Sequence, residues 1–236
     1  MQRYQDYTYQ NAFFVKRWLH QRRYRDTLRF VKLQAQDTVL DYGCGDGYFL
    51  RTCAMVMPAG HLYGFEPDPD MYREAVRITR GTGITVVRTL DALRGKVFTK
   101  ITCLETGEHL VDRELTALFA HIKQLLAHGG QVVISVPIET GVPALLKNTF
   151  RILRGHIPGN FTLLNFWRMV FGVSIPRSIP EDREYGQYIY LHMGFNHQRF
   201  EEMLKQHLRI KGKRYSPLSI VGAALSNTIL YACMRR

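Results

Sequence analysis

The sequence predicts an α/β fold with a doubly wound, mostly parallel sheet, and two observations lead to this prediction. Short apolar runs and helical stretches follow one another in the order strand, loop, helix, strand, helix, strand, strand, helix, strand, which is typical of such sheets. The first apolar run ends in Asp41 and is followed by Gly43, Gly45 and Gly47. A chain of 236 residues is also long enough for one domain with a substantial core.

The individual elements follow from periodicity and from breaker residues. Helices are expected at residues 13–33, 48–57, 71–79 and 111–128, the first and the last because their apolar residues recur at helical spacing. Pro58 and Gly60 end the second helix, and the pair Gly129–Gly130 ends the fourth. Strands are expected between them at residues 38–41, 61–65, 84–87, 97–104 and 131–136.

The C-terminal part is expected to complete the same domain. A turn and helix are predicted at residues 192–207, and the runs 208–215 and 227–234 alternate well enough to be strands six and seven. These two strands form a reversed hairpin at the end of a seven-stranded sheet. The run 216–234 approaches membrane-spanning length, but its proline, glycine and polar residues favour two strands joined by a loop.

The glycines after the first strand have the features of a small-molecule cradle, because glycine tolerates positive φ and lets the backbone approach a ligand closely. A dinucleotide fingerprint would need its third glycine at Tyr48, so that interpretation fails. An acidic residue two positions before the first of several glycines spaced by two instead resembles motif I of the class I S-adenosylmethionine (SAM) methyltransferases. An ordinary glycine-rich turn is the alternative.

This resemblance covers residues 13–137 and implies a Rossmann-like fold with a SAM site. Asp41 and the glycine loop would hold the methionine part of SAM. Glu66, at the end of the second strand, would accept hydrogen bonds from both ribose hydroxyls, because a carboxylate has two acceptor oxygens. A helix cap is the alternative role, although Asp68 and Asp70 are better placed for it. The remaining cofactor-binding residues implied by the resemblance are Cys44, Asp91 at the adenine amino group, Ala92 under the ring, and Leu104; for Asp91, a plain surface position is the alternative.

Glu105, Glu108 and His109 follow the fourth strand, where the methyl group would be delivered, and they are the candidate catalytic residues. A similar Glu-x-x-Glu-His run in quinone-biosynthesis O-methyltransferases and in small-RNA 3′-end 2′-O-methyltransferases binds a divalent cation. The resemblance therefore implies Mg²⁺ or Mn²⁺, which suit two carboxylates and an imidazole, with His192 as a further ligand. The alternative is that His109 acts as a general base or as a pocket wall.

Residues 138–180 form an expected helical insertion or lid after strand five. Two short apolar helices with basic residues, at 143–154 and 161–172, predict an interfacial membrane element or a lid over a hydrophobic substrate. Quinone O-methyltransferases carry a membrane-contacting insertion at the same point, which supports the membrane interpretation by analogy. Helices that simply pack on this domain are the alternative. Residues 177–190 are polar and are expected to form a loop.

Charge and cysteine usage bear on partners and on location. The net charge of +12 is concentrated in residues 1–36, with +6, and in residues 205–236, with +7. These basic ends predict attraction to an anionic membrane surface, an acidic glycan or nucleic acid, or else merely a solvated surface. The four cysteines show no Cys-x-x-Cys spacing and are expected to be reduced thiols of a cytoplasmic protein. No signal peptide is expected at the polar N-terminus.

The sequence therefore predicts a single domain, residues 1–236, with an N-terminal helical cap at 1–36. Its expected activity is SAM-dependent O-methylation of a small-molecule, glycan or lipid-associated, quinone-like acceptor, in the cytoplasm and peripheral to the inner face of the membrane. An RNA 2′-O-methyltransferase is the alternative enzyme, but no RNA-binding module is recognisable and the insertion is apolar rather than basic and aromatic. The third hypothesis is a non-catalytic subunit with a SAM fold.

Overall fold

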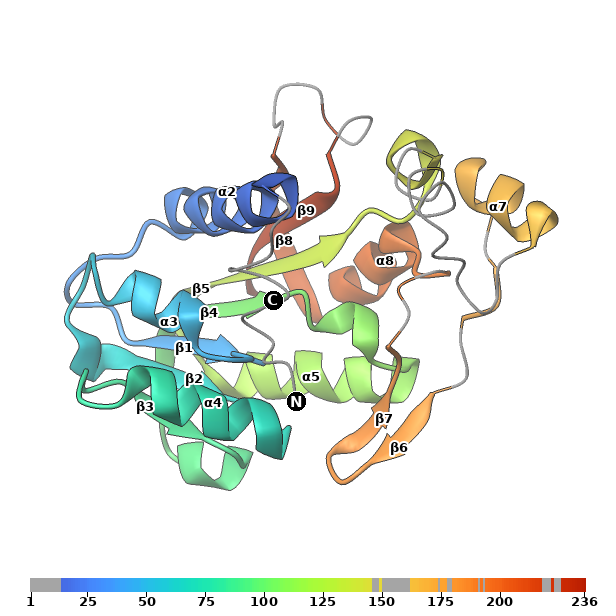
Figure 1. Cartoon of the computed structure of the whole chain (residues 1–236). Helices are drawn as coiled ribbons and strands as arrows, with labels where there is room; N and C mark the ends of the chain where they lie inside the picture. The colour runs from blue at the N-terminus through green and yellow to red at the C-terminus, as the bar shows by residue number, and fades with distance from the viewer. Residues whose placement is uncertain are drawn as a thin grey trace.

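The computed structural model describes residues 14–145, 149, 162–173, 175–177, 180–190, 192, 194–217, 222 and 226–236 (Figure 1). Its centre is a seven-stranded sheet with the strand order β3-β2-β1-β4-β5-β9-β8. The strands are β1 (Val39–Tyr42), β2 (Leu62–Phe65), β3 (Thr85–Val87), β4 (Phe98–Leu104), β5 (Leu126–Pro137), β8 (Leu208–Ser216) and β9 (Thr228–Arg235). This sheet confirms the α/β, Rossmann-like prediction.

The strand directions place the carboxyl ends of the first five strands at one edge of the sheet. β1 pairs in parallel with β2 and β4, β2 with β3, and β4 with β5. β9 runs antiparallel to both β5 and β8, which confirms the reversed hairpin expected at the C-terminal end. Because the chain order reverses on either side of β1, ligands of such sheets bind at the carboxyl ends of β1 and β4.

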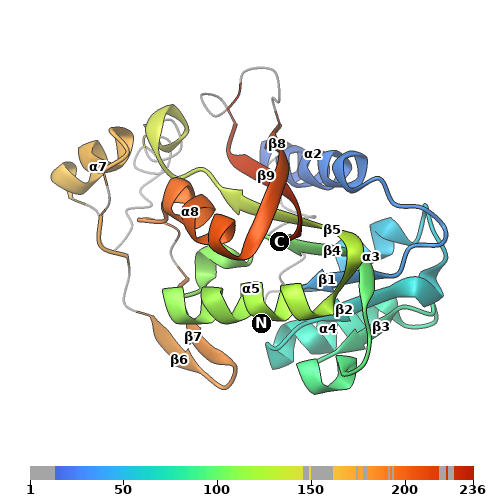
Figure 2. The same ribbon diagram turned by 180° about the vertical axis from the view of Figure 1, so that it is seen from behind.

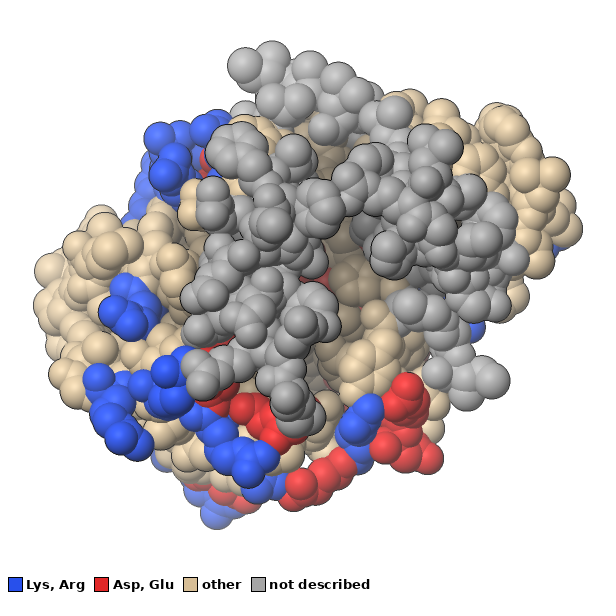
Figure 3. Space-filling view, viewed as in Figure 1, with Lys and Arg blue, Asp and Glu red and all other residues tan. Residues whose placement is uncertain are grey.

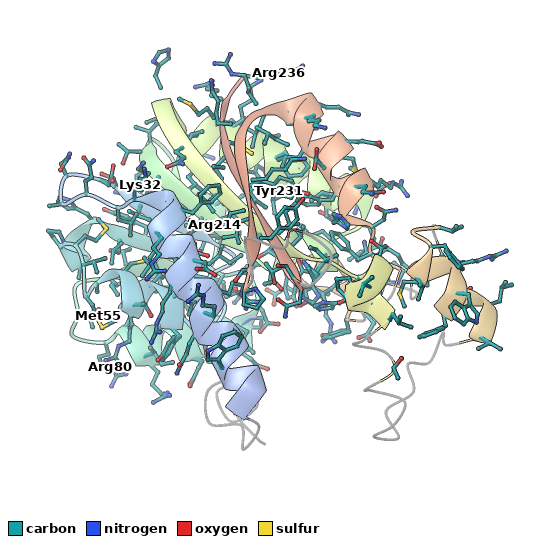
Figure 4. All side chains as sticks on the ribbon, turned by 90° about the horizontal axis from the view of Figure 1, so that it is seen from above. Lys32, Met55, Arg80, Arg214, Tyr231 and Arg236 are labelled. Atoms are coloured by element: carbon teal, nitrogen blue, oxygen red, sulfur yellow. The ribbon has the colours of Figure 1, made fainter. Side chains whose placement is uncertain are left out.

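Helices cover both faces of the sheet. The first face is covered by α2 (Phe14–Val31), α3 (Tyr48–Cys53) and α4 (Pro69–Thr79). Figure 4 looks down on α2, which crosses β5, β9 and β8; the guanidinium of Arg214 in β8 lies 5.8 Å from the Phe30 ring of α2. The second face is covered by α5 (Asp112–Leu125) and α8 (His197–His207), which lie side by side in Figure 2.

Strand alternation explains the two layers of core. In β1, Val39 packs toward α3, whereas Leu40 and Tyr42 belong to the cluster under α5 and α8. The larger cluster includes Phe119 of α5 and Phe200 of α8, whose ring centroids lie 5.6 Å apart. Burying such side chains removes apolar surface from water, which is the main stabilising contribution to a fold of this size.

Most of the sequence-predicted elements are confirmed within a few residues, and two predictions are wrong. The helix expected to end at Gly129–Gly130 ends at Leu125, and both glycines lie within β5. The register of β4 against β5 shifts there, between the pairs Phe98–Leu126 and Lys100–Gln131, and Gly129 adopts φ 75°. The two glycines therefore allow a β-bulge-like irregularity within β5, and they do not cap the helix.

The second correction concerns the expected loop at 177–190. It contains a small antiparallel hairpin, β6 (Glu181–Arg183) and β7 (Gly186–Tyr188). Of the insertion, the structure describes α7 (Leu163–Val170) and a helical turn at 141–145, while most of the helix expected at 143–154 lies outside the described residues. The described helices include none with the length and hydrophobicity that a membrane span requires. The short helical turns are η1 (Ala59–His61), η2 (Leu90–Leu93) and η3 (Gly107–His109).

Candidate functional site

The glycine loop begins where β1 ends, and its backbone is tied to the neighbouring strand. The amides of Gly43 and Cys44 both donate to the carbonyl of Phe65, at 2.8 and 3.0 Å. Gly43, Gly45 and Gly47 have φ angles of 75°, 55° and 77°, a region that glycine occupies without the strain of a side chain. Gly43 is also crowded, because a Cβ built there would lie 2.6 Å from Oγ1 of Thr106. At Gly45 the same Cβ would meet no atom within 4 Å, so the loop is open on that side.

Glu66 joins the end of β2 to this loop. Its Oε2 accepts a hydrogen bond of 2.8 Å from the amide of Gly45, and its Oε1 accepts one of 3.0 Å from the amide of Asp68. Burial raises the pKa of Glu66 to about 7, although the two amide bonds act in the opposite direction. The helix-capping role falls to Asp68, whose side chain accepts from the amides of Asp70 and Met71. The carboxylate of Glu66 is therefore available to organise the loop and a ligand beside it.

Asp41 lies at the carboxyl end of β1 and is almost completely buried. Its Oδ1 accepts a hydrogen bond of 2.7 Å from Oγ1 of Thr102 in β4, a partner that the sequence interpretation missed. Burial raises the pKa of Asp41 to about 7, and the hydrogen bond from Thr102 only partly opposes this shift. Within the described part of the chain, no Lys or Arg forms an ion pair with Asp41, Asp46 or Glu66. Three buried acids without a cation fit a ligand that is itself positively charged, as the ammonium and sulfonium groups of SAM are.

The other sequence-predicted cofactor residues lie at the rim or beneath the loop. Cys44 is buried, and its Sγ lies 2.7 Å from the position that a Cβ of Gly64 would occupy. Leu104, the last residue of β4, is half-buried against the cluster under α3. Asp91 lies in η2 with 83% of its side chain exposed and an ion pair of 2.9 Å to Arg94, and Ala92 beside it is also exposed. Their roles toward adenine stay predictions.

Glu105 is turned away from the acids that follow it in the chain. It has a φ angle of 52°, which is rare for a residue with a side chain. Its Oε1 accepts from Oγ of Ser135 at 3.1 Å, and its Oε2 forms an ion pair of 3.0 Å with Nη1 of Arg23 in α2. The group expected from the Glu-x-x-Glu-His run is therefore divided, and Glu105 faces the N-terminal helix.

Glu108, His109 and His192 do come together. One potential ligand atom of each lies within 4.8 Å of those of the other two. Glu108 is completely buried, and among the residues that the structure describes neither of its carboxylate oxygens has a hydrogen-bond partner. Burial, reinforced by the nearby charge of Glu105, raises the pKa of Glu108 well above its usual range. Such a group is costly in the folded protein unless a ligand or a proton satisfies it.

The protonation state of His109 follows from its surroundings. Its Nδ1 lies 2.8 Å from the carbonyl oxygen of Ile189, which can only accept, so Nδ1 carries the proton. Its Nε2 then presents a lone pair, 3.9 Å from Oε1 of Glu108. Burial lowers the pKa of His109 below its usual value, so the neutral imidazole is favoured. This arrangement suits a proton acceptor or a metal ligand equally well.

The hairpin β6–β7 supplies parts of this site that the sequence interpretation missed. The Tyr188 ring stacks on His109 with a centroid distance of 4.7 Å and an interplanar angle of 8°. At the turn of the hairpin, the hydroxyl of Tyr185 donates to Oδ2 of Asp68 at 3.0 Å, and Glu184 pairs with Arg88. Figure 3 shows acidic side chains gathered over the hairpin, which carries Glu181, Asp182 and Glu184. Tyr188 and Tyr190, which alternate after Gly186, were a sequence signal for the second of these strands.

Glu139 is a further buried acid that the sequence interpretation did not single out. It is completely buried two residues after β5, and its Oε1 lies 3.8 Å from Nδ1 of His192. An acid just past a strand end was the same signal that identified Asp41 and Glu66. A pocket of about 430 Å³ lies beside Gly107 and Leu110, and its lining is both apolar and charged: Phe195, Phe200 and Met203 lie there together with Asp112, Arg177 and Arg199.

Comparison with known proteins places this geometry in a family. The model of the methyltransferase domain family matches residues 15–171, whereas no curated protein sequence matches the chain. A solved structure of the PH0226 protein from Pyrococcus horikoshii OT3 superposes with a TM-score of 0.64 at 14% identity, over 99% of this chain and 96% of that one.

Two further structures were solved with S-adenosylhomocysteine (SAH). Magnesium protoporphyrin IX methyltransferase (ChlM) from Synechocystis PCC 6803 has a TM-score of 0.60 at 16% identity, over 96% of this chain and 89% of its own. The N-methyltransferase NodS from Bradyrhizobium japonicum WM9 has a TM-score of 0.56 at 15% identity, over 92% and 87%. At these identities the structures demonstrate a shared fold, and the domain match demonstrates the family.

Proposed function

Because this chain belongs to the methyltransferase domain family and is a SAM-dependent methyltransferase, we propose that it methylates a hydroxyl oxygen. The acceptor is a small molecule, a glycan or a lipid-associated, quinone-like compound. The observation that carries the proposal is the pair formed by the buried Glu108, whose two oxygens have no hydrogen-bond partner in the described part of the chain, and the Nε2 lone pair of the half-buried His109. A hydroxyl group is both a donor and an acceptor, and it must lose a proton when its oxygen is methylated.

The chain's own residues would bind and orient SAM, which supplies an electrophilic methyl group on its sulfonium. Asp41 and the glycine loop would hold the methionine part, and Glu66 would hold the ribose while it keeps Gly45 in place. Burial raises the pKa of both carboxyl groups to about 7. A cationic ligand against them would lower these pKa values and favour the ionised carboxylates. Alignment of the acceptor oxygen with the methyl carbon is the main contribution of such a site to the rate.

His109 would take the proton of the acceptor hydroxyl at Nε2. The carbonyl of Ile189 fixes the proton on Nδ1, and the Tyr188 ring fixes the plane of the imidazole. Glu108, 3.9 Å from Nε2, would stabilise the imidazolium that forms.

The same cluster supports a second proposal, a divalent cation held by Glu108, His109 and His192. One buried carboxylate and two imidazoles are a plausible ligand set, and an Mg²⁺ or Mn²⁺ ion would lower the pKa of a bound hydroxyl. Glu105 is left out of this set because it pairs with Arg23. Titration with Mn²⁺, followed by electron paramagnetic resonance, tests the proposal: one site lost in Glu108→Gln supports it, and no specific binding contradicts it.

The exposed face of α7 supports contact with a membrane or with a lipid acceptor. Its inner residue Met169 packs on Ala144 and Ile175, which belong to the same insertion. Its outer side chains remain exposed, and Figure 3 shows few charges on that part of the surface. The exposed apolar residues are Leu163, Leu164, Trp167 and Phe171, with 68%, 60%, 47% and 76% of their surface accessible.

The experiment that tests the proposed function is transfer of radiolabelled methyl from SAM into a host extract, followed by fractionation. Label in lipid or glycan that survives mild alkali would identify a methyl ether and support the proposal. Alkali-labile label would indicate a carboxyl ester, and label on nitrogen would contradict an oxygen acceptor. Label in RNA would favour the 2′-O-methyltransferase instead. No label, with SAH still bound, would point to a non-catalytic subunit. His109→Gln serves as the control that separates enzymatic from spontaneous labelling.

A further inference from the structure

Arg23 is a buried cation beside an acidic site, and the function proposed above does not use it. It lies on α2 with 15% of its side chain exposed, and its Nη1 forms an ion pair of 3.0 Å with Oε2 of Glu105, which is 18% exposed. Its positive charge also acts to lower the pKa of Glu108 against the effect of burial. Removing a guanidinium from water costs solvation free energy, which a charged partner must offset.

The position of Arg23 relative to the glycine loop follows from three contacts. Its partner Glu105 is bonded to Thr106, whose side chain fills the space where a Cβ of Gly43 would lie. The neighbouring ring of Tyr24 lies 6.2 Å from that of Tyr48 and 5.1 Å from that of Phe49, at the start of α3. The helix α2 therefore packs through Tyr24 against the end of the loop where α3 begins, and Arg23 beside it pairs with Glu105, the residue that follows β4.

The chemistry of SAM makes this position informative. Its methionine part carries an ammonium group and a carboxylate, and the buried acids described above suit only the ammonium group and the sulfonium. A guanidinium has five N–H donors in a planar fork and can hold two carboxylates at once. We propose that Arg23 binds the α-carboxylate of SAM and that Glu105 is a positioning residue that orients its guanidinium. This inference rests on SAM dependence and is independent of the acceptor atom.

A purely structural ion pair between α2 and β4 is the competing explanation, and ligand discrimination separates the two. Calorimetry would compare the binding of SAM with that of decarboxylated SAM, which keeps the ammonium and sulfonium groups but lacks the carboxylate. We expect the native chain to prefer SAM by roughly ten- to a hundredfold, the range for a hydrogen bond between charged groups. In Arg23→Gln the two ligands should bind within about threefold of each other, because only SAM loses a partner.

Arg25→Gln is the matched control, because Arg25 is an exposed arginine on the same helix. It should keep the full preference for SAM. Equal weakening of both ligands in Arg23→Gln would indicate a structural role and overturn the proposal, as would an unchanged preference. Urea unfolding checks that the variant is folded. If it is not, Arg23→Lys keeps a charge without the fork, and a preference for SAM that stays undiminished in that variant would overturn the proposal as well. If the protein turned out not to methylate hydroxyl groups, the expected difference between SAM and decarboxylated SAM would still hold. Failure of the proposed function and failure of this inference are therefore distinguishable.

Discussion

The carboxylate of Glu66 accepts a hydrogen bond of 2.8 Å from the amide of Gly45, so the acid that ends β2 holds the loop that follows β1. Substitution of this residue should therefore affect the shape of the loop and, under the role proposed above, a contact with the ribose of SAM. We expect Glu66→Ala to weaken SAH binding by at least roughly a hundredfold, since charged hydrogen bonds each contribute about 1.5 to 3 kcal/mol. Calorimetry measures the affinity, and circular dichroism should show a folded variant; unchanged affinity would remove the ribose role.

Gly43 and Gly45 should respond differently to alanine. Both have positive φ, which costs a residue with a side chain roughly 1 to 2 kcal/mol, but only at Gly43 would the new Cβ collide with Thr106. We expect Gly43→Ala to lower the free energy of unfolding by about 3 kcal/mol. Gly45→Ala should cost about 1 kcal/mol and chiefly reduce SAH affinity, since its Cβ points into open space. Urea unfolding and calorimetry on both variants would show whether these effects separate; equal losses of stability would contradict the geometry.

The burial of Asp41 predicts a pH dependence of stability. Its pKa is about 7 in the folded protein against an ordinary value of 3.8, so folding favours the protonated form. The stabilising contribution is fully present below about pH 4 and is lost as pH rises through 7, at about 1.4 kcal/mol per pKa unit. The Asp41→Asn side chain cannot ionise. The free energy of unfolding of this variant, relative to that of the native chain, should therefore rise by about 3 to 4 kcal/mol from pH 4 to pH 8. Parallel profiles from urea unfolding without cofactor would show that Asp41 is not the group responsible.

His109 should set the acidic limb of the pH–rate profile. A general base works in its neutral form, and burial lowers the pKa of His109 below 6.5. We expect the acidic limb of kcat/KM to have its midpoint at a lower pH than an unperturbed imidazole would give. His109→Gln should reduce kcat by roughly 10² to 10⁴ and abolish this limb while SAH affinity stays unchanged. A variant that keeps the limb would assign it to another group.

The exposed face of α7 gives a prediction for membranes. Trp167→Glu and Phe171→Glu place a charge where an apolar contact with lipid is expected, and each should weaken binding to vesicles of phosphatidylglycerol and phosphatidylcholine roughly tenfold. Met55→Glu is the matched control, because Met55 is 77% exposed just after α3 and lies far from α7 in Figure 4. Co-sedimentation measures the binding. If the native chain ignores these vesicles, or if Met55→Glu has the same effect, α7 is not the contact.

The sequence alone was sufficient for the strand–loop–helix unit and for the order of the sheet. Asp41, the glycine loop and Glu66 lie in short segments in which strand ends and backbone conformation are local properties. Parallel strands then bring their carboxyl ends to one edge, so the placement of Asp41, Glu66 and Glu108 at that edge follows from the order of the elements. The hairpin β6–β7 was missed because a short polar stretch carries a weak local signal, although its alternating tyrosines were informative.

Only the tertiary structure decided how the acids after β4 are used. Glu105 and Glu108 are three residues apart, yet one faces Arg23 on the N-terminal helix and the other faces His109 and His192. The protonation state of His109 depends on a carbonyl 80 residues further along the chain. Burial, and with it the pKa of each acid, depends on which distant segments cover it, because desolvation is a property of the packed molecule. Local sequence thus determined the glycine loop and the acids at the strand ends, and long-range packing determined the partners and the protonation of the groups beside them.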